Sequence, residues 1–455
     1  MDKTYRPYDP DQLLLLPPSL RDWLPPGHLA YFLADVVDGL DLSAISQVYE
    51  REARGYPPYH PALMVKVLLY GYARGVRSSR RLARACVEDV AFRVLAANNT
   101  PDFRTISEFR RRHLPALAAL FQQVLRLCRR AGLATLGTVA LDSTKVQANA
   151  SKHTAMSYAR MERAERELEA KVRAILEEAE RVDLEEDQRF GLDRRGDELP
   201  EELADPGRRL QKIREAKAAL EQEAREQATR AAEAARAKLE ERQQRAGKAK
   251  GRPARVPDPA QARPAPTAQR NFTDPDSKIM QGPDGFLQAY NTQTVVDVPS
   301  QVIVAHAVSS QPADVEHLQP MVEQVLQRTR RRPGRLLADA GYCSAGNLAY
   351  LERRGIEGYV ATERTQHGAP LPPAPRGRPP LRLSLRERMA RRLRTRRGQR
   401  VYRLRMLTSE PVHGQIKQAM GFRQFLLRGL AKVRAEWALL CTAFNLRKLW
   451  GATYG

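Results

Sequence analysis

Cysteines are few and long apolar segments are missing from this sequence of 455 residues. Its four cysteines stand far apart, without a C-x-x-C pair: Cys86, Cys128, Cys343 and Cys441. This scatter predicts reduced thiols, and argues against a disulfide framework or a zinc site. The N-terminal run of four leucines is flanked by charged residues and prolines. It is far shorter than the roughly 20 apolar residues of a membrane-spanning helix and does not resemble a signal peptide. We therefore expect a soluble, cytoplasmic protein with no membrane partner.

Acidic residues are clearly outnumbered by basic residues. The chain has 53 Asp and Glu against 76 Lys and Arg, which gives a formal net charge of +23. So large an excess calls for a polyanionic partner, and nucleic acid is the commonest one. The composition therefore predicts a protein associated with the nucleoid, but it indicates no mechanism.

Residues 1–135 predict an all-helical domain. Apolar residues recur every three or four positions between residues 63 and 70 and again between 82 and 94. Gly71, Gly75 and a Ser-Ser pair predict a break between two helices. A later helix carries the basic run Arg110, Arg111 and Arg112. We expect these helices to contact DNA in a helix-turn-helix-like arrangement. A helical bundle with solvated arginines explains the pattern equally well.

The pattern changes after residue 135. Alternating β-branched residues predict a strand near 137–142, within a first core segment at 136–154. Residues 155–246 are highly charged, with apolar residues at heptad-like spacing on both sides of a Gly-, Pro- and Asp-rich stretch. They predict a coiled-coil-like helical hairpin that serves as a spacer or dimerisation arm. Residues 247–269 are rich in Pro, Ala, Lys and Arg, and predict a flexible basic linker.

Residues 270–455 mix strand and helix signals, which predicts an α/β fold with a mixed sheet. Two strands are expected to form a hairpin around Pro299-Ser300. Helices and short strands alternate from His317 to about residue 362. We expect a Pro- and Arg-rich loop at 370–400 that contacts DNA phosphates, and helix from about 407 to 450.

Three carboxylates stand out by their position. Asp142 is placed at the end of the first strand, Asp339 ends the strand in LLADAGY, and Glu410 begins a helix in TSEPVHGQIK. Two strand-borne aspartates and one helix-borne glutamate suit a site that holds two Mg²⁺ ions about 3.5–4 Å apart for phosphoryl transfer. Taken singly, each carboxylate is more simply a structural residue.

Five extended segments, in order, resemble the motifs of DDE-type transposases of bacterial insertion sequences. The resemblance covers nearly the whole chain and rests on these segments: RGYPPYHPALMVKVLLYGYARGVRSSRRLA with AFRVLAANNTPDFRTISEFRRRH, ALDSTKVQANAS, RNFTDPDSKIM with AYNTQTVVD, LADAGYCSAGNLAYLERRGIEGYVAT, and SEPVHGQIKQAMGFRQFLLRGLAKVRAEWALLCTAFNLRKL. It implies an RNase H-like catalytic core with a helical N-terminal domain and a helical insertion.

The resemblance also implies an activity and a site. A transposase of this family cleaves DNA at the terminal inverted repeats of its element and joins the freed 3′-OH to target DNA. It uses two Mg²⁺ or Mn²⁺ ions, which Asp142, Asp339 and Glu410 would bind as the catalytic triad. A homodimer would hold the two ends in the synaptic complex.

Further residues become candidates for DNA contact. In related transposases a Tyr, a basic residue and a Lys surround the catalytic Glu, and Tyr402, Arg405 and Lys417 are their counterparts here. Lys145, three residues after Asp142, is a candidate phosphate contact, although a solvated lysine is equally plausible.

The glutamate segment departs from the family pattern in three places. The base most often stands four residues before the Glu, where this chain has Met406. Ser409 stands where an apolar residue is usual, and His413 where an aromatic one is usual. Elsewhere, Asp274 and Asp276 offer possible metal ligands, although a turn held by side-chain hydrogen bonds explains them better.

Two other functions remain open from the sequence. A decayed transposase would bind the ends without cutting them, and a nuclease with the same core would cut without joining. The intact carboxylates favour an active transposase.

Overall fold

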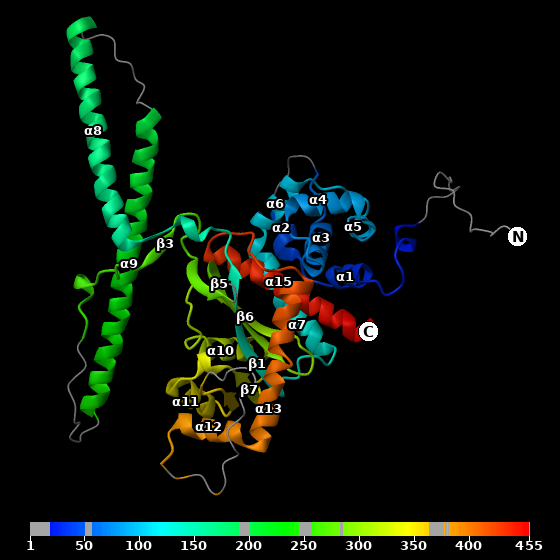
Figure 1. Ribbon diagram of the computed structural model, residues 1–455. Coiled ribbons are helices and arrows are strands. Elements are labelled where there is room, and N and C mark those ends of the chain that lie inside the picture. Colours follow the sequence, from blue (N-terminus) through cyan, green and yellow to red (C-terminus); the bar gives the residue numbers. More distant parts are fainter. Residues whose placement is uncertain are drawn as a thin grey trace, which may run out of the picture.

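The computed structural model describes residues 19–50, 57–190, 201–244, 256–282, 285–363, 377, 380 and 382–454. A group of helices, a mixed sheet with its covering helices, and a long projecting helical hairpin make up the structure (Figure 1). None of the helices in this part of the chain is long and apolar enough to cross a membrane.

Short helices precede the first strand. They are η1 (Leu20–Asp22), α1 (Leu29–Asp38), α2 (Ser43–Glu50), α3 (Pro61–Arg74), α4 (Ser79–Glu88), α5 (Val90–Leu95), α6 (Phe103–Arg112) and α7 (Leu114–Arg130). The predicted break is confirmed between α3 and α4, where Gly75 adopts the left-handed conformation (φ 79°) and the Ser78 hydroxyl caps α4. Gly71 instead lies inside α3. A Cβ there would come within 2.4 Å of a Leu82 methyl carbon, so the glycine allows α4 to approach α3 closely.

The sheet has β1 (Thr138–Gln147) at its centre. Its neighbours are β4 (Lys278–Gly282), β5 (Gly285–Asp297), β6 (Ile303–Ser309), β7 (Arg335–Ala338) and β8 (Glu357–Val360). β5 pairs antiparallel with β1 on one edge and with β4 and β6 on the other. On the opposite side of β1, β7 and then β8 are parallel, so the sheet is mixed as predicted. The strand predicted near 137–142 is longer than expected, because β5 pairs with β1 as far as Gln147.

Helices cover this sheet and join it to the N-terminal helices. They are α10 (Leu318–Thr329), α11 (Ala345–Arg353) and α15 (Leu430–Tyr454). α15 packs against α7, α3 and β6, so the end of the chain is built into the same core as its beginning. Trp437 on α15 is fully buried in this core.

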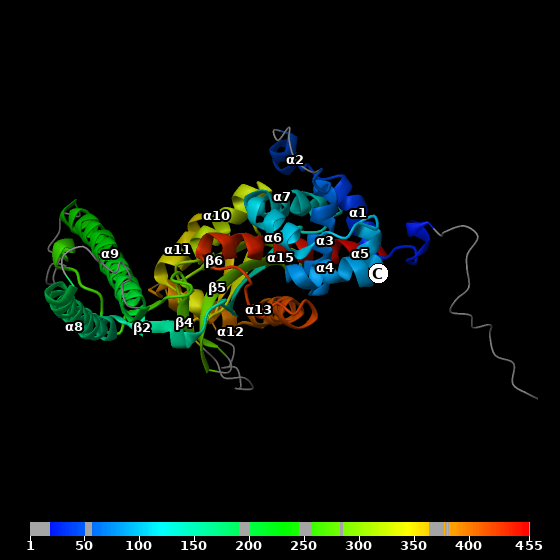
Figure 2. The same ribbon diagram turned by 90° about the horizontal axis from the view of Figure 1, so that it is seen from above.

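The helical hairpin is formed by α8 (Tyr158–Phe190) and α9 (Glu201–Gln244), and it projects away from the sheet in both views (Figures 1 and 2). Met161 of α8 packs against Ile213 and Leu220 of α9, and Glu165 forms ion pairs with Arg214 and Lys217. A two-stranded sheet, β2 (Ala155–Ser157) and β3 (Gln269–Asn271), joins the hairpin to the core. The predicted hairpin is therefore confirmed.

The predicted linker and loop differ from the structure. Residues 247–255 lie outside the described part, whereas 256–269 include η3 (Pro259–Gln261), which contacts α9. The predicted loop at 370–400 is wrong for its second half, which forms α12 (Leu385–Arg394) and α13 (Arg396–Met406). A capping box of Ser384 and Glu387 begins α12, and the Thr395 hydroxyl caps α13.

The predicted continuous helix from 407 to 450 is also interrupted. α14 (Ser409–Gly414) runs into a π-helical turn at Gln415–Ala419, and residues 420–429 are not helical before α15 begins. Gly421 and Gly429, with φ of 60° and 84°, bound this interruption.

Candidate carboxylate site

Asp142 and Asp339 lie on adjacent parallel strands. Leu141 of β1 stands opposite Ala338, the last residue of β7, so the next residue on each strand is an aspartate. Asp142 is in the middle of β1, because β5 extends the strand beyond it; the prediction that it ends the strand is wrong. Its backbone is nevertheless at the end of the β1–β7 pairing, where the carbonyl ends of two parallel strands leave space for a ligand.

An arginine from α13 joins the two carboxylates. The Arg405 Nη2 atom is 3.3 Å from the Asp142 Oδ1 atom and 3.8 Å from the Asp339 Oδ2 atom. The Arg405 and Asp142 side chains are only 15% and 10% exposed, whereas that of Asp339 is 37% exposed. Arg405, predicted from the sequence as a DNA contact, is thus held here as a counter-ion of the two aspartates.

Burial dominates the acid–base behaviour of this pair. It raises the pKa of Asp142, against the opposing effect of Arg405. It also raises the pKa of Asp339, and the neighbouring Asp142 carboxylate adds to that rise. Tyr402, on the same helix as Arg405, lies in this group too, and burial raises the pKa of its hydroxyl. Asp142 and Asp339 therefore lie close together with limited access to solvent, and a nearby cation is needed to stabilise their ionised forms.

Two lysines lie beside β1. The Lys145 ammonium group donates to the Pro312 carbonyl at 3.0 Å and is 3.5 Å from the Asp314 Oδ1 atom. The Lys417 ammonium group, from the π-helical turn, donates to the backbone carbonyl of Lys145 at 3.2 Å. Lys145 thus reaches the loop that carries Asp314, whereas Lys417 contacts only the backbone of Lys145.

His413 occupies the other side of Asp142. Its Nδ1 atom is 3.9 Å from the Asp142 Oδ2 atom, and its Nε2 atom is 3.1 Å from the Thr294 hydroxyl. Burial, with help from Lys417 and Arg405, lowers the pKa of His413 to about 3. The imidazole is therefore neutral near pH 7 and places no positive charge against Asp142.

Glu410 lies in the first turn of α14, as predicted, with its side chain exposed to solvent. Over the ranges that the structure covers, no three His, Cys, Asp or Glu side chains are arranged to hold a metal ion. Asp142 and Asp339 offer only carboxylate oxygens, and this donor set fits a hard divalent cation such as Mg²⁺. Arg405 now lies against both of them.

The basic run of α6 has three different environments. Arg110 is buried, with 7% exposure, and donates to the Arg77 carbonyl at 3.0 Å and to the Ser79 hydroxyl at 3.2 Å. Its predicted DNA contact is therefore wrong, because its guanidinium group is used to hold α6 against the start of α4. Arg111 is exposed and paired with Glu108 at 2.6 Å, and the Arg112 guanidinium lies 5.4 Å from the centre of the Tyr49 ring.

Asp274 and Asp276 have a structural role. The Asp274 Oδ1 atom accepts hydrogen bonds from the Tyr290 hydroxyl at 2.7 Å and from the Gly429 N–H at 3.1 Å. The Asp276 Oδ2 atom accepts from the Leu430 N–H at 2.7 Å. Both carboxylates therefore hold the N-terminus of α15, which agrees with the structural alternative.

The sequence analysis missed Asp314 and its partners on β5, Asn291 and Gln293. Both amide side chains donate to the Asp314 Oδ1 atom, at 2.7 and 2.9 Å. The available signal was in AYNTQTVVD, where two amide residues stand two positions apart on a strand that is otherwise suited to burial. Residues two apart share one face of a strand, so they indicate a polar site there.

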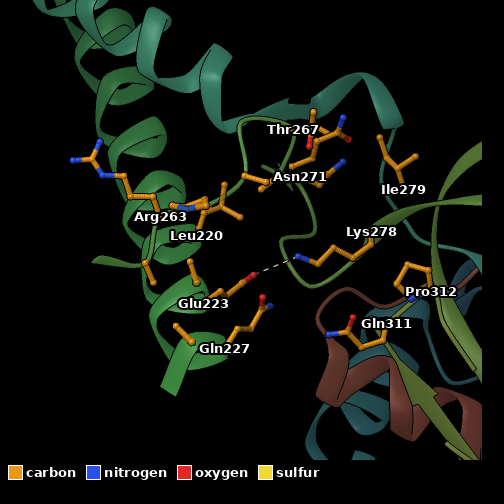
Figure 3. A pocket seen from close by; sticks show the side chains of 18 of the residues that line it. Leu220, Glu223, Gln227, Arg263, Thr267, Asn271, Lys278, Ile279, Gln311 and Pro312 are labelled. Carbon is orange, nitrogen blue, oxygen red and sulfur yellow. Dashed lines mark hydrogen bonds and ion pairs between the residues drawn. The ribbon is translucent and has the colours of Figure 1, made fainter. Parts of the chain in front are cut away.

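An open cleft of about 790 Å³ separates α9 from the sheet (Figure 3). Glu223 of α9 reaches across it towards Lys278 of β4, at 3.4 Å. Gln311 and Pro312, in the loop that also carries Asp314, form part of its opposite wall.

Two family models match the chain. One, described as a transposase domain (DUF772), matches residues 18–112, and the other, described as a transposase DDE domain, matches residues 379–450. No curated protein and no solved structure matches at a significant level. The first match covers the helices α1 to α6, and the second covers the segment with Arg405, Glu410 and Lys417.

Proposed function

Because these two matches support a DDE-type transposase of an insertion sequence, we propose that this chain cleaves DNA at the ends of its element and joins the freed strand to target DNA. The observation that carries this proposal is the placement of Asp142 and Asp339 on adjacent parallel strands, with both carboxylates against one cation. Glu410 is the proposed third member of the triad. The strand order β6-β5-β1-β7-β8 supports an RNase H-like core.

The proposed reaction has two steps at phosphorus. Water attacks a phosphodiester at the end of the element and releases a 3′-OH, and this hydroxyl then attacks a target phosphodiester and displaces another 3′-oxygen. Two Mg²⁺ or Mn²⁺ ions at the aspartates would activate the attacking oxygen and stabilise the leaving oxygen. The buried carboxylates must be ionised to act as ligands, and the neutral His413 beside Asp142 does not compete for its charge.

The cations around the aspartates suit phosphate binding. We assign Lys145, Lys417 and Tyr402 to contacts with the DNA strand next to the cleaved bond, because Lys145 and Tyr402 lie within this charged group and Lys417 contacts the backbone of Lys145. Arg405 neutralises the aspartates here and would be free to contact a phosphate if a metal took its place. Such contacts position DNA without reading its sequence.

The rest of the chain has proposed roles in binding and assembly. We assign end recognition to the helices of residues 1–135, with Arg111 and Arg112 as phosphate contacts. The core comprises residues 136–154 and 270–455, joined through residues 247–269. The hairpin helices α8 and α9 project away from the sheet, to which Glu223 of α9 is joined through Lys278, and this suits a spacer or an arm that pairs two protomers over two DNA ends (Figure 1).

Labelled duplex DNA carrying the ends of the element tests this function. The wild-type protein is compared with Asp142→Asn, Asp339→Asn and Glu410→Gln, in Mg²⁺ or Mn²⁺. Glu352→Gln is the matched control, because Glu352 is exposed on α11, which has no part in the proposed binding or catalysis. We expect metal-dependent nicking at the ends that persists in the control and is lost in the three variants, while DNA binding persists in all of them.

The alternatives give different results in the same assay. Binding of the ends without nicking by the wild type identifies a protein that has lost catalysis. Nicking without joined products, when target DNA is added, identifies a nuclease. Nicking that survives any one of the three substitutions removes that residue from the triad.

A further inference from the structure

Asp314 is a carboxylate that the proposed triad does not include, yet it lies at the same end of the sheet. It belongs to the loop between β6 and α10. Asn291 and Gln293 of β5 both donate to its Oδ1 atom, and the Tyr342 hydroxyl in turn donates to the Gln293 side-chain carbonyl. Asn291 and Gln293 are fully buried, so the strand fixes the carboxylate firmly despite its loop position.

One oxygen of this carboxylate faces a lysine. The Asp314 Oδ1 atom is 3.5 Å from the Lys145 ammonium group, which also donates to the Pro312 carbonyl in the same loop. The Lys145 and Asp314 side chains are only 19% and 16% exposed. An ion pair so poorly hydrated restricts the lysine far more than an exposed pair does.

The other oxygen faces Asp339. A Cβ placed on Gly341 would lie 3.3 Å from the Asp314 Oδ2 atom and 3.1 Å from the Asp339 Oδ1 atom. The two carboxylates therefore both lie beside Gly341, whose N–H donates to Asp339 at 2.9 Å. Asp314 thus lies near a proposed metal ligand as well as beside Lys145.

We propose that Asp314 is a positioning residue that holds the Lys145 ammonium group next to Asp339, where the lysine meets a DNA phosphate. This inference rests on the proposed function. Without Asp314, the lysine is free to turn towards solvent or to pair with Asp339 itself, and in both cases it leaves the position for the phosphate. Gln311 and Pro312 of the same loop are exposed and line the open cleft beside α9, so the loop is accessible from solvent (Figure 3).

A double-mutant cycle tests whether Asp314 acts through Lys145. Asp314→Asn keeps the size of the side chain and an acceptor oxygen but removes the charge; Lys145→Met removes the ammonium group. We expect Asp314→Asn to lower the single-turnover nicking rate about tenfold, the effect of losing a charged hydrogen bond. In the Lys145→Met background, which is already slow, the same change should alter the rate less than about twofold.

A second readout does not depend on activity. Acylation of Lys145 by an amine-reactive reagent, followed by mass spectrometry on the free protein, reports how firmly the ammonium group is held. We expect several-fold faster labelling in Asp314→Asn, because losing the neighbouring anion lowers the lysine pKa and frees the side chain. Glu352→Gln, at an exposed position on α11, should leave both the labelling and the nicking rate unchanged.

The outcomes separate this inference from the proposed function. Equal rate losses from Asp314→Asn in both backgrounds, or unchanged labelling of Lys145, would overturn the positioning role. If Asp314→Asn unfolds the protein, Lys145→Met alone must reproduce a loss of about tenfold, and a wild-type rate in that variant would equally overturn it. A wild-type protein that never nicks DNA refutes the proposed function, whereas the labelling experiment still decides how Asp314 acts on Lys145.

Discussion

Replacing Arg405 by glutamine should make the free protein bind divalent metal more tightly. The Arg405 guanidinium now lies 3.3 Å from Asp142 and 3.8 Å from Asp339, where an entering cation must compete with it. Gln has no charge and a shorter side chain. The variant therefore leaves two poorly hydrated carboxylates without a counter-ion, and a metal ion then gains all of their attraction.

The size of the effect follows from the geometry. At 3.3 Å, two unit charges attract by about 5 kcal/mol if the effective dielectric constant is about 20. Desolvation and ordering of the arginine offset much of this attraction, and hydrogen bonds to charged groups contribute about 1.5–3 kcal/mol net. At about 1.4 kcal/mol for each factor of ten, Arg405→Gln should bind Mn²⁺ roughly 10 to 100 times more tightly than the wild type in the absence of DNA.

Isothermal titration calorimetry with Mn²⁺ on the DNA-free protein measures this change. Arg403→Gln, at an exposed position on the same helix, is the matched control and should bind like the wild type. Adding Asp142→Asn to Arg405→Gln should abolish the gain, which locates the metal at the aspartates. Equal or weaker Mn²⁺ binding by Arg405→Gln, with Arg403→Gln unchanged, would refute the view that the arginine occupies the metal position.

Four further predictions concern pH, packing and DNA contact. Burial raises the pKa of both aspartates, so protons compete with metal at low pH. The nicking rate should therefore rise as the pH passes through these raised pKa values and then level off. Arg405→Gln should move that rise to higher pH, because Arg405 lowers the pKa of both carboxyl groups. His413→Phe should leave the shape of this profile unchanged between about pH 6 and 9, because the His413 pKa of about 3 keeps the ring neutral throughout. Gly71→Ala should destabilise the protein by about 1–3 kcal/mol and lower its melting temperature in calorimetry, because the added methyl group would lie 2.4 Å from Leu82. Arg111→Gln should weaken DNA binding about equally for all sequences and reduce the slope of log K against log salt by about 1 in a filter-binding series.

The sequence was sufficient to predict most helices and strands, because hydrophobic periodicity is a local property. The hairpin of α8 and α9 and the pairing of β5 with β6 followed from it directly. The prediction was wrong at α12 and α13, where the high content of arginine leaves too few apolar residues to show a helical pattern. The structure shows that Ser384 and Thr395 cap these helices, and neither residue was recognised as a helix start in the sequence.

The candidate site was predictable only in part. The flanking apolar residues placed Asp142 and Asp339 on strands, but their adjacency depends on the parallel pairing of β1 with β7, which no local pattern predicts. The contact of Arg405 with both aspartates depends on how α13 crosses the sheet, and the sequence carries no local sign of that. Asp314 was missed for the same reason, since it is recognisable only through partners on β5.

The helical hairpin lies in the sequence between β1 and its partner strands, so the sheet can form only late in synthesis. β1 emerges from the ribosome before the hairpin, but its partners β5 and β7 follow only after it. Pairing over such long separations in sequence is slow, and β1 has no sheet to join until then. A chain that stops before α13 therefore lacks Arg405, Glu410 and also α15, whose packing against α3 and α7 completes the core of the N-terminal helices, so such a truncated product would leave that core open.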